Sequence, residues 1–288
     1  TQGGDLMDIN KIFDCLKKNT IELVFYTERD KAVKGCSKFG GKPDIPESFE
    51  WPYFCTNTFD DDEIKPRALA FLMQINCEEI SEFDKDGLLP DKGMLYFFYE
   101  LGSQRWGFDP KDRGCARVYY YAGEELETRE LPDDMEEQSI LPEIPVGFKA
   151  RDDVPGIGEY FIHYDRNVDW DEYYDSREER FTGPAGERKI TKLLGYGDEI
   201  QGDMLAECEM TGGRGIYTGN GYPEMTEKEK NELLKASEEW TLLFQLDTVR
   251  KNGFELMFGD DGRIFYYIRK DDLKNKNFEN IWLILQCG

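Results

Sequence analysis

The stretch Leu69-Ala-Phe-Leu-Met-Gln-Ile-Asn76 is followed by Gly93-Met-Leu-Tyr-Phe-Phe-Tyr-Glu100, and both have counterparts near the C-terminus. The counterparts are Thr241-Leu-Leu-Phe-Gln-Leu-Asp247 and Gly262-Arg-Ile-Phe-Tyr-Tyr-Ile-Arg269. In each case an apolar run containing one glutamine precedes a glycine that opens an aromatic strand. Because aromatic and branched residues favour strands, we interpret the pattern as an internal duplication of a strand pair.

Helices are expected to flank these strands. Residues 5–18 place apolar side chains at three- and four-residue intervals, which predicts a helix capped by Asp5. Residues 21–27 follow as a strand. Later, Thr226-Glu-Lys-Glu229 is a capping box that starts a helix reaching about Trp240. The predicted fold class is therefore α+β, with two related halves, mostly antiparallel sheets and flanking helices, packed as one body.

We expect four segments along the chain. Residues 1–36 supply an N-terminal helix and strand, residues 37–123 the first repeat half and residues 192–288 the second. Residues 124–191 are expected to form an irregular acidic connector, since they are rich in acidic side chains and include the least periodic part of the chain. Within the connector, Phe161-Ile-His-Tyr164 is typical of a strand.

The charge of the chain limits its partners. The 288 residues include 60 Asp and Glu against 36 Lys and Arg, for a formal net charge of −24. Such a field repels phosphate backbones and favours cationic partners, so we expect no nucleic-acid binding.

The cysteines indicate a reducing compartment. There are seven, at wide spacing and without a C-x-x-C pair, which favours free thiols over a disulfide framework or a zinc site. We expect no signal peptide and no membrane association, because the longest apolar run is too short to cross a bilayer. The predicted location is the cytoplasm.

Metal and histidine chemistry have weak support. Asp165, Asn167, Asp169 and Asp171 resemble the start of a calcium loop, but the positions for glycine and glutamate hold Trp170 and Ser176. We therefore predict an acidic loop and no metal. His163 is the single histidine, which excludes a two-histidine zinc site. A structural role is favoured for it, and a Cys–His pair stays open because sequence spacing does not fix distance in space.

Two loops carry possible ligand contacts. Gly40-Gly41 permits a positive φ or a close backbone approach, and Trp51 follows in the same proline-rich segment, which either lines a pocket or wraps the core edge. The run Gly213–Gly219 lacks the spacing of a phosphate-binding fingerprint. Arg214 within it remains a candidate contact for an anionic ligand.

The paired glutamines, Gln74 and Gln245, have two interpretations. A buried amide must satisfy its donors and acceptor. We favour bonds to loop backbone, including the Gly40-Gly41 loop and the Gly195 loop, with Gly195 matched to Gly40. The alternative is two equivalent amides that face a pocket between the halves. Either way, the pair is expected to be related by an approximate twofold axis.

The chain contains, in this order, the motifs Ser37-Lys-Phe-Gly-Gly-Lys-Pro43, Trp51-Pro52, Leu69–Asn76, Leu89-Pro90, Gly93–Phe98, Arg117–Tyr120, Leu193–Tyr196 with Ile200-Gln201, Leu242–Asp247 and Gly259–Gly262. This order of motifs resembles that of the YwqG-like family, also called the DUF1963 family. The chain reads Gly197-Asp198 where the family usually has glycine and proline. The resemblance, from about Ser37 to the C-terminus, implies an α+β protein with pseudo-symmetric halves and no assigned biochemical function. Some bacterial members are encoded near polymorphic toxins, which implies an immunity role for them.

Taken together, these patterns favour a non-enzymatic cytoplasmic binding protein whose acidic surface docks a basic protein partner, such as a toxin domain. The alternative is a small-ligand-binding protein or an uncharacterised enzyme with a cleft between the halves. We predict no catalytic residue and no cofactor. The candidate ligand contacts are Gln74, Gln245, Gly40, Gly41, Trp51 and Arg214.

Overall fold

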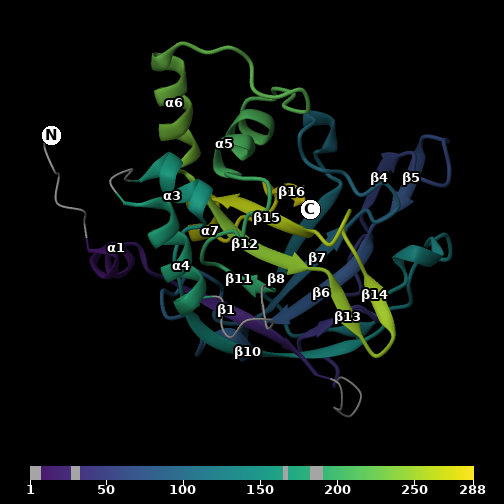
Figure 1. The fold of residues 1–288 in the computed structure, drawn as a ribbon. Coiled ribbons are helices and arrows are strands. Elements are labelled where there is room, and N and C mark those ends of the chain that lie inside the picture. The colour runs from purple at the N-terminus through teal and green to yellow at the C-terminus, as the bar shows by residue number, and fades with distance from the viewer. Residues whose placement is uncertain (1–7, 27–32, 165–167, 182–190) are drawn as a thin grey trace, which may run out of the picture.

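The computed structural model describes residues 8–26, 33–164, 168–181 and 191–288. Its centre is a ten-stranded sheet with the order β16-β15-β12-β11-β1-β10-β2-β6-β7-β8 (Figure 1). Each neighbouring pair is antiparallel. The strands are β1 Lys18–Phe25, β2 Lys38–Phe39, β6 Ala70–Asn76, β7 Met94–Tyr99, β8 Ala116–Tyr121, β10 Ile144–Asp153, β11 Lys192–Leu193, β12 Trp240–Asp247, β15 Arg263–Arg269 and β16 Trp282–Gln286.

Smaller elements surround this sheet. Three two-stranded pairs join β3 Asp44–Ile45 to β9 Glu127–Thr128, β4 Tyr53–Thr56 to β5 Lys65–Ala68, and β13 Val249–Lys251 to β14 Phe254–Leu256. The helices are α1 Ile9–Leu16, α2 Cys77–Ile80, α3 Ile157–His163, α4 Trp170–Phe181, α5 Leu205–Glu207, α6 Glu227–Ser237 and α7 Lys270–Lys274. A π-helical turn, Cys208–Gly213, continues α5, and short 3₁₀ turns cover Pro110–Asp112 and Glu137–Ser139. No helix among the described residues is both long and apolar enough to cross a membrane.

The strands β1 and β10 form the middle of the sheet. On one side of this pair lie β2, β6, β7 and β8, here called the first side, and on the other lie β11, β12, β15 and β16, the second side. Lys38 of β2 lies opposite Gln74 of β6, and Lys192 of β11 lies opposite Gln245 of β12. Each glutamine strand also has a register shift just before its glutamine, between Phe71 and Met73 or between Leu242 and Phe244.

One apolar core joins the two sides. The rings of Phe97 on β7 and Phe244 on β12 have centroids 4.5 Å apart. The hydroxyl of Tyr266 on β15 donates to the carbonyl oxygen of Phe98 at 3.0 Å. Fully buried aromatic side chains of this size each contribute a few kcal/mol to stability, so the sides are held together as one body.

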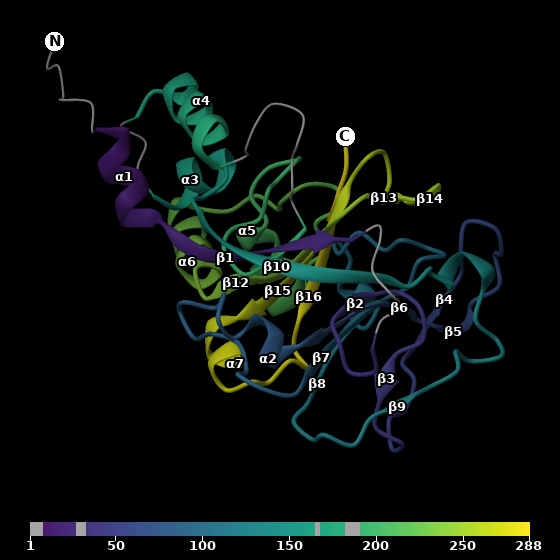
Figure 2. The same ribbon diagram turned by 90° about the horizontal axis from the view of Figure 1, so that it is seen from below.

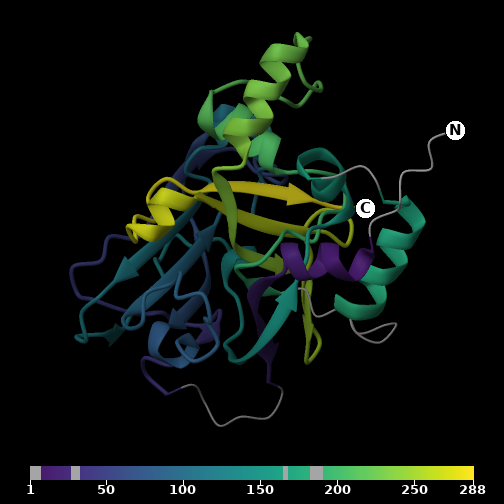
Figure 3. The same ribbon diagram turned by 90° about the vertical axis from the view of Figure 1, so that its left-hand side faces the viewer.

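The N-terminal helix packs beside the helices of the connector, as the purple and teal ribbons of Figure 3 show. Phe13 of α1 makes an edge contact with Tyr173 of α4, with ring centroids 5.3 Å apart. Tyr173 in turn stacks on Tyr160 of α3 at 4.2 Å. The apolar face predicted for the first helix is therefore used for packing.

The mixed α/β architecture and the mostly antiparallel sheet are confirmed, as is the Thr226–Glu229 capping box. The first helix is shorter than predicted: Asp8 caps it through a bond from the amide of Asn10, and Asp5 lies outside the described residues. The irregular connector was a wrong prediction for residues 144–153, which form β10 and pair along the whole of β1.

The strand predicted for Phe161–Tyr164 was also wrong. Residues 157–163 form helix α3, which packs Tyr160 into the aromatic contact with α4. The aromatic content of this stretch suggested a strand. In the structure the stretch is helical, and Tyr160 is buried against Tyr173 of α4.

Candidate functional site

Gln74 lies in β6 and is wholly buried. Its Oε1 accepts a hydrogen bond from the backbone amide of Asp44 at 2.8 Å, and its Nε2 donates to the Cys36 carbonyl at 2.7 Å and to Oδ2 of Asp44 at 2.9 Å. Nζ of Lys38 lies 3.6 Å from the same Oδ2 and 2.9 Å from a Glu143 oxygen. We call Lys38, Asp44 and Gln74 the first cluster.

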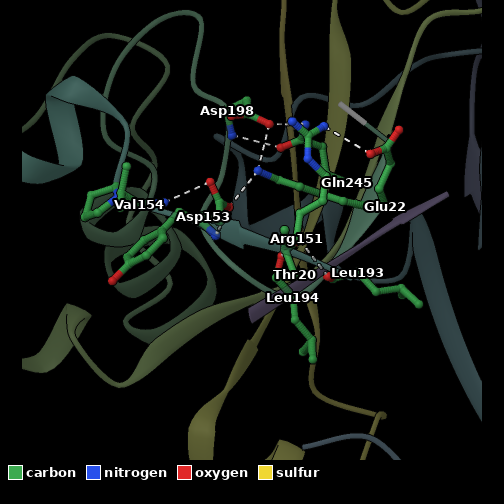
Figure 4. A network of polar contacts seen from close by, with 12 residues as sticks. Thr20, Glu22, Arg151, Asp153, Val154, Leu193, Leu194, Asp198 and Gln245 are labelled. Carbon is green, nitrogen blue, oxygen red and sulfur yellow. Dashed lines mark hydrogen bonds and ion pairs between the residues drawn. The ribbon is translucent and has the colours of Figure 1, made fainter. Parts of the chain in front are cut away.

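Gln245 holds the matching place in β12, also wholly buried. Its Oε1 accepts from the amide of Asp198 at 2.8 Å, and its Nε2 donates to Oδ2 of Asp198 at 2.9 Å (Figure 4). Nζ of Lys192 lies 2.8 Å from that Oδ2 and 2.9 Å from Oδ2 of Asp153. Arg177 reaches the other oxygen of Asp198 at 2.9 Å. We call Lys192, Asp198 and Gln245 the second cluster.

The two aspartates are kept ionised by different means. Burial opposes the charge of Asp198, but the cations Lys192 and Arg177 outweigh it and hold the pKa of this carboxyl below its usual value. Burial also opposes the charge of Asp44, whose pKa is lowered first by hydrogen bonds from Thr128, Gly35 and Gln74 and then by the charge of Lys38. The first cluster therefore depends on neutral donors and the second on cations.

These contacts occupy the glutamine amides. The predicted bonds from each glutamine to loop backbone are confirmed at Asp44 and Asp198, which follow the two glycine loops. Neither glutamine lines the cavities described below. Their burial and bonds are those of groups that tie strands to loops.

The glycine loops are tight. Gly40 and Gly41 have φ of 58° and 71°, and a Cβ on Gly40 would lie 2.3 Å from the carbonyl oxygen of Pro142. In the loop between Lys192 and Asp198 of the second cluster, the corresponding φ values are 61° at Leu194 and 80° at Gly195. The strand registers thus align Gly195 with Gly41, one residue from the predicted match with Gly40.

Trp51 and Arg214 lie elsewhere. The indole Nε1 of Trp51 donates to the carbonyl of Leu69 at 2.9 Å, and its ring lies 5.3 Å from that of Phe98 in the first-side core. Arg214 pairs with Glu209 at 3.1 Å, beside the π-helical turn. The six candidate ligand contacts are therefore not gathered in one site.

His163 contacts a carboxylate inside the protein. Its Nε2 lies 3.0 Å from Oδ2 of Asp203, and both side chains are buried. Burial lowers the pKa of His163, but the contact and charge of Asp203 outweigh it and raise the pKa above the usual value. Cys208 lies in a neighbouring apolar cluster, where burial raises the pKa of its thiol well above the usual range. Since the thiolate is the nucleophile, burial disfavours the reactive form of this cysteine.

Only part of the stretch that resembles a calcium loop lies within the described residues. Asp165 and Asn167 lie outside the described residues. Oδ1 of Asp169 accepts from the amides of Asp171 and Glu172 at 3.1 Å, which fits the start of α4. Within the described ranges, no group of three or more His, Cys, Asp and Glu side chains could hold a metal ion.

A cavity of about 620 Å³ lies between the two sides. One wall is the loop 86–88 after α2, and the opposite wall is α7 with residues up to Lys276. The start of β1 and the Leu194-Gly195 turn line it as well. Figure 2 shows α7, in yellow, beside α2, in blue. Four lysines, Lys18, Lys270, Lys274 and Lys276, line this cavity, which we call the lysine cleft.

The wall of the lysine cleft is fixed by hydrogen bonds. The backbone amide of Asn19 donates to Oδ2 of Asp86 at 3.3 Å, and its side-chain Oδ1 accepts from the backbone amide of Lys85 at 3.0 Å. Asp84 accepts from the amide of Leu89 at 2.7 Å. The loop is thus pinned to β1, and the cleft is largely preformed. Sequence reasoning missed this site, although three lysines between positions 270 and 276 are a local basic run in an acidic chain.

A smaller cavity of about 270 Å³ lies between β1 and β13. Glu22 and Asp247 line it, and burial raises the pKa of Asp247 to about 6. Glu22 contacts Arg151 at 3.0 Å, and Asp247 lies 3.6 Å from Arg263. The carboxylates of this cavity therefore already have cationic partners.

Comparison with protein families supports the resemblance drawn from the motifs. A family described as "Domain of unknown function (DUF1963)" matches residues 37–287, and the YwqG-like label is consistent with it. Comparison with curated proteins gives no match. The family match spans most of the chain, both glutamine clusters and most of the residues around the lysine cleft. The chain therefore belongs to the DUF1963 family.

Proposed function

We propose that the protein is a non-enzymatic binding protein for a small molecule and that the lysine cleft is its binding site. The observation that carries this proposal is a cavity of about 620 Å³ at the junction of the two sides. Ligand sites commonly enclose about 300–1,000 Å³ and lie where structural units meet. The proposal corresponds to the cleft between the halves that was the alternative interpretation of the sequence.

The chemistry around the lysine cleft favours binding over catalysis. Its described lining consists of Lys, Asp, Asn, Thr, Leu and Gly side chains, without histidine, cysteine, serine or tyrosine. A nucleophile next to a general base is the usual signature of covalent catalysis, and these lining residues do not supply one.

We also infer that the two sides arose by internal duplication. The equal spacing from Lys38 to Asp44 and from Lys192 to Asp198 supports this, as do the shared strand order and the matching register shifts. In this view β1 and β10 join two copies of one unit, and the lysine cleft is a feature of their junction.

A second candidate function is docking of a basic protein, such as a toxin domain, on the acidic surface in the cytoplasm. The net charge of −24 favours it, because such a field accelerates encounters with cationic partners. Pull-downs from native lysate at low and high salt test it. A basic partner released by salt supports docking, and the lack of any salt-sensitive partner counts against it.

The small-molecule proposal is tested by blocking the lysine cleft. Leu88 lies in the wall of the cleft and is 42% exposed. Leu88→Trp would therefore fill part of the cavity without forcing a larger side chain into the packed core. Thermal shifts are measured with a panel of organic acids, amines and neutral aromatics. Ile64→Trp is the matched control, since Ile64 is 71% exposed and does not line the cleft.

A bound compound at a hundred times its Kd adds about 2.7 kcal/mol of stability. Compounds that raise Tm of the wild type and the Ile64→Trp control, but not of Leu88→Trp, support the proposal. Shifts that are the same in all three proteins, or no shift with any compound, overturn it.

A further inference from the structure

The lysine cleft is a local reversal of the charge of the chain. Its lining has four lysines and two aspartates, for a formal charge of +2, in a protein whose net charge is −24. Among the described residues, none of the four ammonium groups has a carboxylate within 4.0 Å, whereas Lys38 and Lys192 in the two clusters each have two such partners. Charges more than about 8–10 Å away are screened at ordinary salt, so the distant acidic surface contributes little to the field in the cleft.

Lys18 is the most constrained of the four. Its ammonium lies 3.9 Å from the centroid of the Tyr196 ring, a cation–π contact that fixes its position. Burial is the main cause that lowers the pKa of Lys18, and the positive charge of Lys270 lowers it further, against the attraction of Glu159. The ammonium groups of Lys18 and Lys270 therefore repel each other across the cleft.

Three carboxylates, those of Glu159, Asp153 and Asp86, act on Lys18 in the opposite direction to Lys270. Glu159 is buried outside the lining of the cleft, and its burial raises the pKa of its carboxyl to about 7, which weakens its charge at neutral pH. Asp86 accepts a hydrogen bond from the Asn19 amide, which occupies one of its oxygens. A ligand anion between Lys18 and Lys270 would relieve their repulsion.

The cleft also has an apolar surface, formed by three leucines. Leu194 and Leu273 are buried and form part of its lining, and Leu88 exposes 42% of its side chain beside them. Covering this exposed leucine surface with an apolar part of a ligand would lower the free energy of the complex. The ligand that fits both features has an acidic group and an apolar body.

We propose, building on the proposed function, that the lysine cleft binds a small organic anion whose acidic group lies between Lys18 and Lys270 and whose apolar body packs on Leu88, Leu194 and Leu273. The ammonium groups supply charge-assisted hydrogen bonds to the acidic group. The leucines exclude water from the body of the ligand and strengthen those bonds.

Two fluorescent probes with the same apolar body test this proposal. The probes are 8-anilinonaphthalene-1-sulfonate and its uncharged counterpart N-phenyl-1-naphthylamine, titrated by fluorescence at pH 7.5. The full chain is compared with Lys18→Gln, Lys270→Gln and Lys18→Arg. Lys228→Gln is the matched control, because Lys228 is 85% exposed on α6 and outside the cleft.

The sulfonate probe is expected to bind the wild type and the Lys228→Gln control alike. Loss of one charge-assisted contact weakens binding by about tenfold, so Lys18→Gln and Lys270→Gln should each raise its Kd by about that factor, while Lys18→Arg restores much of the affinity. The uncharged probe should bind more weakly and respond little to the lysine variants. Circular dichroism melts of each variant check that the fold is intact.

Two other outcomes separate the two proposals. If both probes bind with equal affinity and Leu88→Trp blocks them, the cleft binds small molecules but the anion proposal is overturned. If Leu88→Trp and the lysine variants leave binding of the sulfonate probe unchanged, the lysine cleft is not its site, and the proposed function fails with it.

Discussion

The first and second clusters solve one structural problem in two ways. In both, a buried glutamine binds the backbone and carboxylate of an aspartate that follows a glycine loop. Asp44 is completed by the Thr128 hydroxyl at 2.6 Å and the Gly35 amide at 2.9 Å, with one lysine farther off at 3.6 Å. Asp198 is completed by two cations at 2.8 and 2.9 Å. The loop geometry is thus shared, while the charge around it differs.

Replacing the two aspartates is expected to give the largest difference in stability loss between the clusters. Asp198→Asn leaves Lys192 and Arg177 buried with one anion fewer, and breaking a buried pair costs about 3–5 kcal/mol. Asp44→Asn retains an acceptor for neutral donors and is expected to cost about 1–3 kcal/mol. Urea denaturation measures both losses in the free energy of unfolding.

The charge-conserving variant Asp198→Glu serves as a control, because it keeps the anion and alters the geometry alone. If Asp44→Asn is as costly as Asp198→Asn, the distinction between neutral and cationic partners is wrong.

The glycine loops are the next point of comparison. Gly40 is expected to tolerate no side chain, because a Cβ would lie 2.3 Å from the backbone oxygen of Pro142, whereas Leu194 occupies the corresponding place with φ of 61°. Gly40→Ala should lose about 2–4 kcal/mol from the left-handed conformation and the forced backbone shift together. The loss is measured by urea denaturation.

Gly253 is the matched control, since it has φ of 81° with no atom within 4 Å of a Cβ. Gly253→Ala should show the conformational cost alone, about 1–2 kcal/mol. Equal losses for the two variants would mean that the Gly40 loop has room to relax.

The glutamines should behave alike. Gln74→Leu and Gln245→Leu each leave the amide of an aspartate without its acceptor, for an expected loss of about 1–3 kcal/mol apiece. The double variant should lose the sum within about 0.5 kcal/mol, because the two glutamines bind different aspartates in different clusters. Unfolding curves and titration with the sulfonate probe measure stability and binding in parallel.

Binding at the lysine cleft should survive in both glutamine variants. Loss of probe binding by a variant whose far-UV spectrum and melt remain cooperative would instead favour the interpretation of paired amides that face a ligand.

The smallest effect concerns pH and the second side. Burial, opposed by hydrogen bonds from the amides of α3, raises the pKa of Glu199 to about 7. The folded state therefore binds more protons than the unfolded state above pH 4.5, so the contribution of Glu199 is complete below that pH and is lost as the pH rises through 7. Because Glu199 is partly exposed, we expect Glu199→Gln to gain about 1 kcal/mol at pH 8 and nothing at pH 4.5.

The pH effect is measured by urea denaturation at the two pH values, with Glu224→Gln, an exposed carboxyl, as the control. A gain of the same size at both pH values would show that the charge of Glu199 is not the cause.

Much of the fold followed from local patterns. The glutamine strands and the Thr226–Glu229 capping box were recognisable because apolar period and capping residues agree there. Strand β10 was missed because polar side chains obscure its alternation. Arg151 pairs with Glu22, and Asp153 pairs with Lys192, so charged residues of this strand serve the interior.

The lysine cleft could not be assembled from the sequence. Its lysines come from β1 and α7, and the opposite wall comes from the loop after α2. A local pattern contains no information about which segments meet across a sheet of ten strands. By contrast, the matching roles of Lys38 and Lys192 could have been predicted from the sequence, because each precedes a glycine loop and an aspartate at the same spacing.

The central position of β1 has a consequence for assembly. This strand pairs with β10 along one edge and with β11 along the other, so its removal would open two edges in the middle of the sheet. Open edges are templates for strands of other chains. If β1 detaches from one copy, the β1 strand of a second copy can pair with the exposed edges of β10 and β11. Reciprocal exchange of these strands would link two chains as a domain-swapped dimer.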